Sequence, residues 1–333
     1  MHMRNPEQLI DGMQGLTALV VGDVMVDAYL WGRVDRISPE APVPVVRIAE
    51  RSTRLGGAAN VALNIRALGA TPVVLSVTGA DDDGARLLQL FKQLGLPTEG
   101  LITSTRRHTT VKTRVISGHQ HIVRVDDETD AELDDIDAAA LTERASQLFE
   151  QRKPDVVILE DYDKGVLTDR TITALIALAR QYKVPVAVDP KKRNFFAYTN
   201  VDLFKPNLKE LREGLKTEID TADPGNVRAA VIELEARLHN GASLITLSEH
   251  GIYAHAGTEE HLLPAHTREI ADVSGAGDTV IAVAALCLAQ RSGLRELAAL
   301  SNLAGGLVCE HVGVAPIERA ELLAETRRLG AAL

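Results

Sequence analysis

Short runs of apolar residues, each about as long as a β-strand, recur along the chain and alternate with amphipathic segments of helical length. The runs are residues 18–21, 73–77, 156–159, 184–188, 202–204 and 244–247. Continuous apolar runs of this length suit a parallel sheet that is buried on both faces. The helical segments are residues 84–94, 169–182, 208–215, 226–238 and 294–311. This alternation predicts an α/β fold with a doubly wound, mostly parallel sheet.

In such sheets, ligands collect beyond the carboxyl ends of the strands. The polar residues that follow the apolar runs are therefore the first ones to examine. They are Asp23, Glu160, Asp161, Asp189, Asn207 and Ser248.

Residues 272–279, Asp-Val-Ser-Gly-Ala-Gly-Asp-Thr, precede an apolar run and look like a helix start that cradles an anion. Glycines let the backbone approach a ligand, and the unpaired N–H groups of a first helical turn point toward an anion there. The carboxylate of Asp278 would stay ionised within reach of a substrate hydroxyl, so it is a candidate general base. The alternative is that the glycines only close a tight turn and that Asp278 serves the helix end.

A second glycine-rich segment, Leu-Gly-Gly-Ala-Ala-Asn at residues 55–60, also opens an apolar periodic segment. Two such segments indicate a binding site that is made of two halves. The alternative is that Gly57 and its alanine neighbours only let a helix pack close to a sheet, with Asn60 an incidental polar residue.

Two segments, residues 29–50 and 109–126, interrupt the alternation and predict short antiparallel strands. Together they resemble a small lid inserted in two pieces into a single domain that spans residues 1–333. Lys112, Arg114 and Arg124 add cations to this lid. A small sheet with an apolar outer face needs a cover, so we expect a homodimer formed through the lid.

The composition excludes several classes of protein. A formal charge of −10 disfavours a nucleic acid as the main partner. The two cysteines, Cys287 and Cys309, fall in apolar helical stretches, as buried free thiols do in a reducing compartment. The N-terminus is too polar for a signal peptide, and no apolar run is long enough to span a bilayer. We therefore expect a soluble cytoplasmic protein that does not bind membranes.

The two glycine-rich segments, in this order and with a split lid, resemble the signatures of the ribokinase/PfkB carbohydrate kinases along essentially the whole chain. The resemblance implies that Gly56, Gly57 and Asn60 face the sugar. It also implies that Asp278 is the catalytic base and that the amides of Gly275, Ala276 and Gly277 form the anion hole. ATP would be the co-substrate, with Mg²⁺ as cofactor.

Further residues of this chain match single positions in the motifs of this family. Asp27, with Asp23 as a neighbour, matches an aspartate that binds sugar hydroxyls. Asn207 and Glu210 match an Asn-x-x-Glu motif that helps to hold Mg²⁺, usually through water, as suits a hard cation that prefers oxygen ligands. The alternative is a helix-capping box formed by the same two residues, and both uses are compatible.

On the nucleotide side, residues 246–251, with Ser248 and Gly251, resemble the loop beside ATP in this family. Asn302 matches a position that lies close to the adenine of ATP in this family. Asp272 and Ser274 occupy positions that bind a monovalent cation such as K⁺ in some members, and the sequence leaves open whether they do so here.

Residues 36–46 and 161–167 narrow the resemblance to the heptose 7-phosphate kinases of lipopolysaccharide core synthesis. These enzymes phosphorylate the anomeric hydroxyl of D-glycero-β-D-manno-heptose 7-phosphate to give the 1,7-bisphosphate. The kinase is often fused to an adenylyltransferase, and we expect this chain to be the separate kinase form. The alternatives are another sugar or sugar-phosphate kinase of the family, for fructose 6-phosphate or ribose, and a non-catalytic sugar- and nucleotide-binding regulator.

The substrate phosphate needs cations of its own. The candidates are Lys112, Arg114, Arg124, Lys164 and residues 191–193, and we favour Lys112 and Lys164; solvated surface positions are the alternative for each. The expected substrate-binding residues are thus Asp23, Asp27, Gly56, Gly57, Asn60, Lys112, Arg114, Asp161, Lys164 and Lys191.

Overall fold

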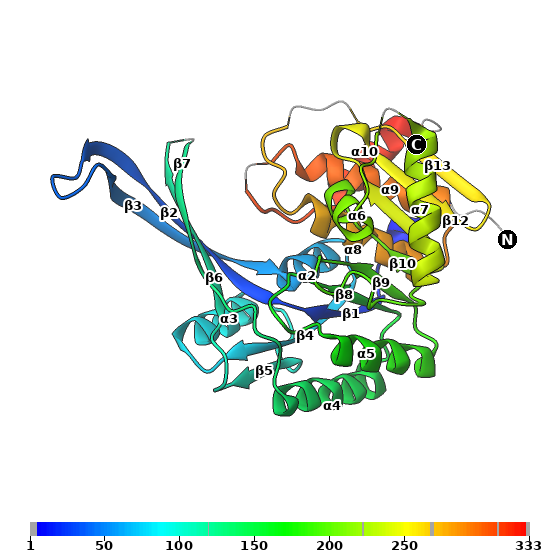
Figure 1. Ribbon diagram of the computed structural model, residues 1–333, viewed down its shortest axis with the longest axis horizontal. Coiled ribbons are helices and arrows are strands. Elements are labelled where there is room, and N and C mark those ends of the chain that lie inside the picture. The colour runs from blue at the N-terminus through cyan, green and yellow to red at the C-terminus, as the bar shows by residue number, and fades with distance from the viewer. Residues whose placement is uncertain (1–4, 119, 222, 267–269, 312, 331–333) are drawn as a thin grey trace.

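The computed structural model describes residues 5–118, 120–221, 223–266, 270–311 and 313–330. Within these residues the strands form a nine-stranded sheet and a four-stranded sheet (Figure 1). The order of the larger sheet is β13-β12-β11-β10-β9-β8-β1-β4-β5. Its strands are β1 (Thr17–Gly22), β4 (Thr71–Gly79), β5 (Leu101–Ser104), β8 (Val156–Glu160), β9 (Val186–Asp189), β10 (Leu203–Phe204), β11 (Ala242–Thr246), β12 (Ile252–Ala256) and β13 (Glu259–Leu263).

The predicted α/β class with a mostly parallel sheet is confirmed. Every predicted apolar run contributes to a strand, and the pairs from β5 to β11 are parallel. Among the described residues of this sheet, the antiparallel pairs are β11 with β12 and β12 with β13, at one edge. The sequence analysis did not predict β12 and β13, because neither is a continuous apolar run: β12 reads Ile-Tyr-Ala-His-Ala and β13 reads Glu-Glu-His-Leu-Leu.

Helices cover both faces of the larger sheet (Figure 1). One face carries α1 (Pro6–Gly12), α2 (Ala58–Ala67), α3 (Asp82–Gln93), α8 (Ala276–Ala289), α9 (Leu294–Val308) and α10 (Arg319–Leu329); the other carries α4 (Asp135–Arg152), α5 (Asp169–Tyr182), α6 (Leu208–Leu215) and α7 (Pro224–Leu238). Helix α8 packs on α2, α9 and the sheet, and is therefore apolar on all sides. No described helix combines the length and apolar character needed to cross a membrane.

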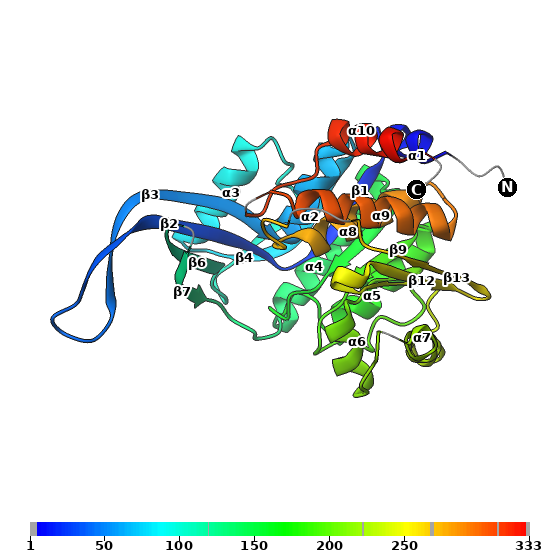
Figure 2. The same cartoon turned by 90° about the horizontal axis from the view of Figure 1, so that it is seen from above.

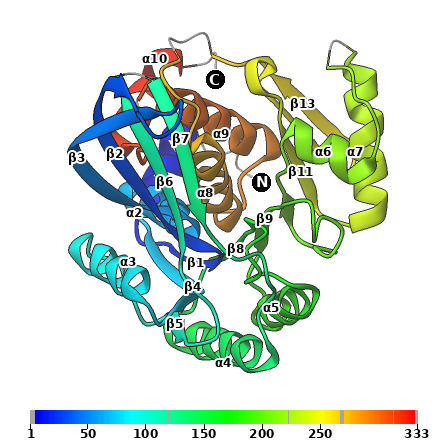
Figure 3. The same ribbon diagram turned by 60° about the vertical axis from the view of Figure 1, so that its left-hand side comes forward.

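The smaller sheet, called the lid sheet here, has the order β3-β2-β6-β7 and extends from the main body as a long arm (Figures 1 and 2). Its strands are β2 (Val24–Ile37), β3 (Pro44–Gly57), β6 (Thr110–Ser117) and β7 (Gln120–Asp127). Strands β2 and β6 lie side by side and run parallel (Figure 3), so the expectation of a wholly antiparallel lid was wrong. Both strands leave the main body in the same direction, which makes their pairing parallel.

Strands β2 and β3 extend beyond the predicted segment 29–50, and their inner ends reach the larger sheet. Strand β2 starts at Val24, almost directly after β1 ends at Gly22, and β3 ends at Gly57, where α2 begins. Fourteen-residue strands carry the arm well beyond the main sheet. The lid sheet is therefore attached at the carboxyl end of β1, the edge of the sheet where ligands are expected.

Candidate active site

Helix α8 begins at this edge with backbone amides available for an anion. Gly275 caps the helix in the left-handed conformation, with φ of 81°. The Ala276 amide donates to the Val273 carbonyl at 3.3 Å, whereas the amides of Gly277 and Asp278 find no acceptor among the described residues. A Cβ built on Gly275 would lie 3.0 Å from Asn60 Nδ2, so a larger residue would crowd the second glycine-rich segment.

Asp278 is buried in the first turn of α8, with 6% of its surface exposed. Asn60 Nδ2 donates to its Oδ2 at 2.6 Å, and the Tyr162 hydroxyl donates to its Oδ1 at 2.8 Å. Burial raises the pKa of Asp278 to about 6, and the Asp189 carboxylate adds to this rise, while the two hydrogen bonds oppose it. At neutral pH the group is therefore ionised, yet its proton affinity is close to that of a useful general base.

The two glycines at the root of the lid sheet make room for aspartates. A Cβ built on Gly56 would lie 2.2 Å from Asp27 Oδ2, and one built on Gly57 would lie 2.3 Å from the Asp23 carbonyl oxygen. Gly57 also has a positive φ of 62°. Asp27 is buried and pairs with Arg114 of β6. The structure thus brings together four of the expected sugar-side residues around the base of the lid sheet.

Asp23 is fully engaged with the loop that follows β8. Its Oδ2 accepts the amides of Tyr162 at 2.9 Å and Lys164 at 3.1 Å, and its Oδ1 accepts the amide of Val166 at 3.0 Å. Burial raises its pKa, although these amides stabilise the anion. Asp23 therefore fixes the position of residues 162–166.

Asp161 is buried in the same loop. The Tyr198 hydroxyl donates to its Oδ2 at 2.6 Å, and the Asp163 amide donates to its Oδ1 at 2.8 Å. Burial and the nearby Asp23 raise its pKa to about 6.

The two lysines favoured for the substrate phosphate meet at one carboxylate. Glu128 Oε2 lies 3.2 Å from Lys112 Nζ, and its Oε1 lies 2.8 Å from Lys164 Nζ. Partial burial raises the pKa of Glu128, but the two ammonium groups outweigh this and lower it. The structure brings these two lysines together, and Glu128 was not anticipated as the anion between them. Arg124 instead pairs with Asp126 on the exposed part of β7.

Three further charged residues line the strand ends near Asp278. Glu160 is 1% exposed, and neither of its carboxylate oxygens finds a partner among the described residues. Burial and the charges of Asp189 and Asp278 raise its pKa well above the ordinary value. Lys205 Nζ lies 2.7 Å from Asp189 Oδ2, and a Cβ built on Gly277 would lie 3.7 Å from both atoms. A buried ammonium group thus lies beside the unpaired amides of α8.

Asn207 and Glu210 form a capping box at the start of α6. Asn207 Oδ1 accepts the Glu210 amide at 2.8 Å, and Glu210 Oε2 accepts the Asn207 amide at 2.8 Å. Glu210 Oε1 also accepts a hydrogen bond from Lys191 Nζ at 2.6 Å. Because these oxygens already have donors, the pair fits a hydrated Mg²⁺ held through water better than a directly bound ion. In the described part of the chain, no cluster of three or more His, Cys, Asp or Glu side chains is arranged to bind a metal ion.

Asp272 and Ser274 lie in the loop before α8. Asp272 accepts the Ser274 amide at 2.9 Å and the Gly313 amide at 3.0 Å. Partial burial raises the pKa of Asp272, but these hydrogen bonds outweigh it and lower the pKa. The carboxylate is thus anionic and tied to the loop.

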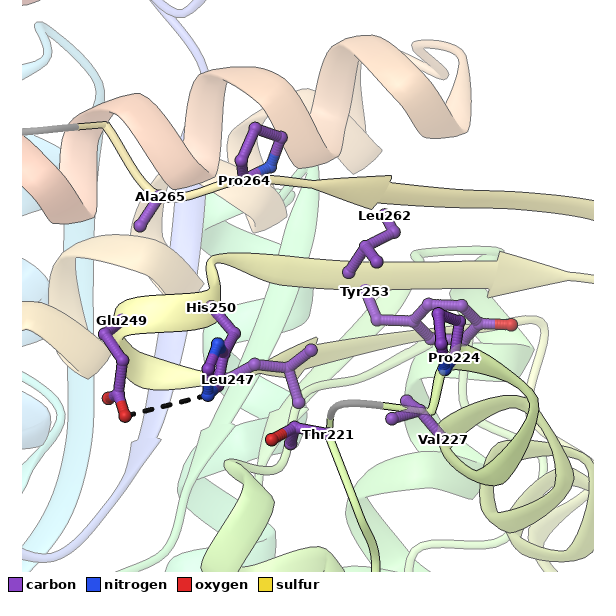
Figure 4. Close-up of a pocket in the computed structure, with 10 residues that line it drawn as sticks. All are labelled: Thr221, Pro224, Val227, Leu247, Glu249, His250, Tyr253, Leu262, Pro264 and Ala265. Carbon is purple, nitrogen blue, oxygen red and sulfur yellow. Dashed lines mark ion pairs between the residues drawn. The ribbon is translucent and has the colours of Figure 1, made fainter.

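A pocket of about 300 Å³ lies beside the predicted nucleotide loop (Figure 4). Leu247, Tyr253 and Leu262 contribute much of its apolar wall, and Val227 of α7 faces them. Ser248 and Gly251, from the loop, have positive φ angles of 54° and 90°. Asn302 of α9 donates to the Pro264 carbonyl at 2.8 Å and thereby holds one wall of the pocket.

Sequence reasoning singled out Asp278 and the glycine-rich segments beside it, but it missed several residues that contact Asp278 or its neighbours. Tyr162, Lys205 and Glu128 were not singled out, and Glu160 was noted only because it follows an apolar run. Lys205 had one sequence signal, its place directly after the run at 202–204. Nothing in the sequence marks the contact of Tyr162 with a residue 116 positions away.

Known proteins resemble this chain in sequence and in structure. HldE of Geobacter metallireducens, named a bifunctional protein, is 40% identical over 326 residues, which are 97% of this chain and 65% of that protein. HldE of Magnetococcus marinus is 43% identical over 316 residues, which are 91% of this chain and 62% of that protein. The chain thus spans slightly less than two thirds of the length of these relatives.

Among solved structures, phosphofructokinase-2 from Escherichia coli in complex with potassium has a TM-score of 0.76 at 20% identity, covering 95% of this chain and 100% of that one. Arabidopsis thaliana ribokinase complexed with ribose and ATP has a TM-score of 0.71 at 17% identity, covering 93% and 99%. The fold is therefore ribokinase-like. The sequence pattern of the pfkB family carbohydrate kinases matches residues 16–320, and with the two sequence relatives it shows that this chain belongs to that family of enzymes.

Proposed function

We propose that this enzyme transfers the γ-phosphoryl group of ATP to the anomeric O1 of D-glycero-β-D-manno-heptose 7-phosphate. The observation that carries the proposal is the position of Asp278. It is a buried carboxylate with a pKa near 6, in the first turn of a helix whose neighbouring amides lack acceptors among the described residues. Such an arrangement can accept a hydroxyl proton next to a transferring anion. The choice of heptose is supported by the resemblance of residues 36–46 and 161–167 to heptose 7-phosphate kinases.

In the proposed reaction, Asp278 accepts the proton of O1 as O1 attacks the γ-phosphorus of ATP. The bond between the γ-phosphorus and the bridging oxygen breaks, and ADP leaves. Of the three amides expected to form the anion hole, that of Ala276 already donates to the Val273 carbonyl. The amides of Gly277 and of the next residue, Asp278, would therefore donate to the oxygens of the transferring group, because neither has to lose a partner first. Lys205 adds a fixed positive charge beside them. Burial lowers the pKa of Lys205, but Asp189 and Glu210 more than offset this effect and raise it. Lys205 therefore stays protonated although it is buried.

Asn207 and Glu210 would hold Mg²⁺ through water, and the bound ion would neutralise charge on the phosphates of ATP. Asp272 and Ser274 would hold a monovalent cation such as K⁺. The anionic, loop-bound state of Asp272 supports this second assignment.

The sugar would lie at the root of the lid sheet, against Asp27, Gly56, Gly57 and Asn60. Its phosphate would bind Lys112 and Lys164, which already hold an anionic carboxylate between them. Phosphate would take the place of that carboxylate, because it offers more charge and more acceptor oxygens. Arg114, Asp161 and Lys191 complete the expected substrate side; Arg114 keeps Asp27 in place, and Lys191 is fixed by Glu210.

The nucleobase would occupy the pocket of Figure 4, between the loop at Ser248–Gly251 and the wall that Asn302 holds. Its apolar wall suits a flat aromatic ring, as in most small-molecule pockets. The phosphates would then run from this pocket toward the start of α8.

Release of ADP, measured with a coupled assay, tests the proposal. The acceptors to compare are D-glycero-β-D-manno-heptose 7-phosphate, fructose 6-phosphate and ribose. We expect the highest kcat/KM with the heptose, and a second phosphate on its anomeric carbon in the ³¹P NMR spectrum of the product. A higher kcat/KM with either other sugar would assign a different kinase activity, and ligand binding without ADP release would indicate a regulator.

A further inference from the structure

Tyr162 makes a direct contact with the proposed base. Its hydroxyl donates to Asp278 Oδ1 at 2.8 Å, while Asn60 occupies the other carboxylate oxygen. Burial, together with the charge of Asp278, raises the pKa of Tyr162 well above its ordinary value, so the hydroxyl keeps its proton. Tyr162 is therefore a permanent donor in this contact.

The position of Tyr162 is fixed from two sides. Its backbone amide donates to Asp23 Oδ2 at 2.9 Å, and Asp23 holds the amides of Lys164 and Val166 in the same way. The ammonium group of Lys191 lies 5.4 Å from the centre of the Tyr162 ring, within the range of a cation–π interaction. Asp23, just after β1, thus fixes the backbone of the loop after β8, and this loop in turn holds the Tyr162 hydroxyl against Asp278 of α8.

We propose that Tyr162 is a positioning residue for Asp278, whose carboxylate plane it fixes together with Asn60 so that a remaining lone pair faces the acceptor hydroxyl. The inference rests on the proposed function, since it concerns the base of that reaction. A single hydrogen bond would leave the carboxylate free to rotate about its Cβ–Cγ bond. Two donors from different elements, α2 and the loop after β8, remove this freedom before substrate binds.

The same hydrogen bond influences the pH at which the base works. The groups that face Asp278 are Asn60 of α2, Glu160 at the end of β8, Tyr162 in the loop after β8, Asp189 of β9 and Lys205 after β10. Burial and Asp189 raise the pKa of Asp278, whereas Tyr162, Asn60 and Lys205 lower it. Loss of the phenol hydroxyl removes one of the lowering contributions. The acid limb of the pH–rate profile, where Asp278 becomes protonated, must then move to higher pH.

Tyr162→Phe removes only the hydroxyl and keeps the ring under Lys191. We expect kcat to fall about tenfold with little change in KM for ATP, because a less well oriented base affects the chemical step. The acid limb should lie above its wild-type position near pH 6. Tyr198→Phe is the matched control: it removes a buried hydroxyl that donates to Asp161 in the same loop, and should leave the limb in place.

A double-mutant cycle tests whether the effect acts through Asp278. In an Asp278→Asn background, adding Tyr162→Phe should change the residual rate by less than about twofold. If Tyr162→Phe has the same rate and the same acid limb as the wild type while Asp278→Asn is inactive, the inference about Tyr162 is overturned and the proposed function is not. Near-normal turnover of Asp278→Asn would instead overturn the proposed function. Should Tyr162→Phe fail to fold, 3-fluorotyrosine at position 162 keeps the shape and is a stronger donor; the limb should then move to lower pH, and an unmoved limb would overturn the inference.

Discussion

Asn60 Nδ2 lies 2.6 Å from Asp278 Oδ2, although the two residues are 218 positions apart in the chain. The contact joins the starts of α2 and α8, and with them the two glycine-rich segments. Each segment alone is compatible with a merely structural turn. Their contact at a buried carboxylate is what makes them one site, with the sugar-side segment supplying a donor to the proposed base.

The first prediction concerns the base itself. Asp278→Asn keeps the shape of the side chain but cannot accept the proton, so kcat should fall by roughly a hundredfold or more. Nucleotide and sugar binding should persist, because neither the α8 amides nor the lid residues change. ADP release and isothermal titration calorimetry measure the two quantities. A variant that turns over at close to the wild-type rate would show that another group accepts the proton.

The same substitution should stabilise the fold at neutral pH. Burial raises the pKa of Asp278 from 3.8 to about 6, so the folded state binds this proton more tightly than the unfolded state does. The associated stability is present below pH 4 and is lost as pH rises through 6, which costs the wild type up to about 3 kcal/mol at pH 7.5.

Asparagine at position 278 carries no charge at any pH and escapes this cost. Thermal melts should therefore give Asp278→Asn a higher Tm than the wild type at pH 7.5, with the difference shrinking toward pH 4. Asp161 also has a raised pKa, but it is common to both proteins and cancels in the comparison. A Tm difference that stays constant with pH would contradict the charged, buried state of Asp278.

The sequence could predict the larger sheet because its central strands are continuously apolar, a pattern that two buried faces impose. The sequence analysis did not identify α4, because the acidic run that precedes this helix suits either a helix cap or a solvated surface. Asp134 in fact caps α4 by accepting the Asp137 amide at 2.8 Å. The sequence could not predict the parallel pairing of β2 with β6 either, because it joins segments more than 80 residues apart. The local sequence pattern of each strand is the same whether the two strands pair parallel or antiparallel.

Within the site, the sequence marked the residues whose type is unusual in its local context. Glycines before a helix and a carboxylate in its first turn are visible as a motif. Tyr162 and Lys205 owe their roles to burial and to partners elsewhere in the chain. A lysine is ordinarily solvated, and only the structure reveals that Lys205 is 2% exposed beside Asp189.

A third prediction concerns the lysine pair and the carboxylate between its members. Lys112→Ala and Lys164→Ala should each raise KM for the phosphosugar about tenfold, the scale of one charge-assisted hydrogen bond to phosphate. Glu128→Gln should lower this KM, because the phosphate no longer displaces a charged competitor. Lys209→Ala is the control, since Lys209 is 84% exposed on α6. Unchanged KM values in both lysine variants would move the phosphate site elsewhere.

The fourth prediction concerns the outer part of the lid sheet, which exposes several large apolar side chains. Val125 and Val123 of β7 are 56% and 49% exposed, and Val43, between β2 and β3, is 51% exposed. Apolar side chains on a thin sheet favour contact with another surface, and a second lid sheet is the cover we expect. Sedimentation at micromolar concentration should therefore show a dimer, and Val125→Asp should shift it toward monomer. Ile232→Asp on α7, at a side chain that is 47% exposed, should leave the dimer intact. A wild-type protein that sediments as a monomer would exclude assembly through the lid, and dissociation by both substitutions would point to a general loss of stability instead of a lid interface.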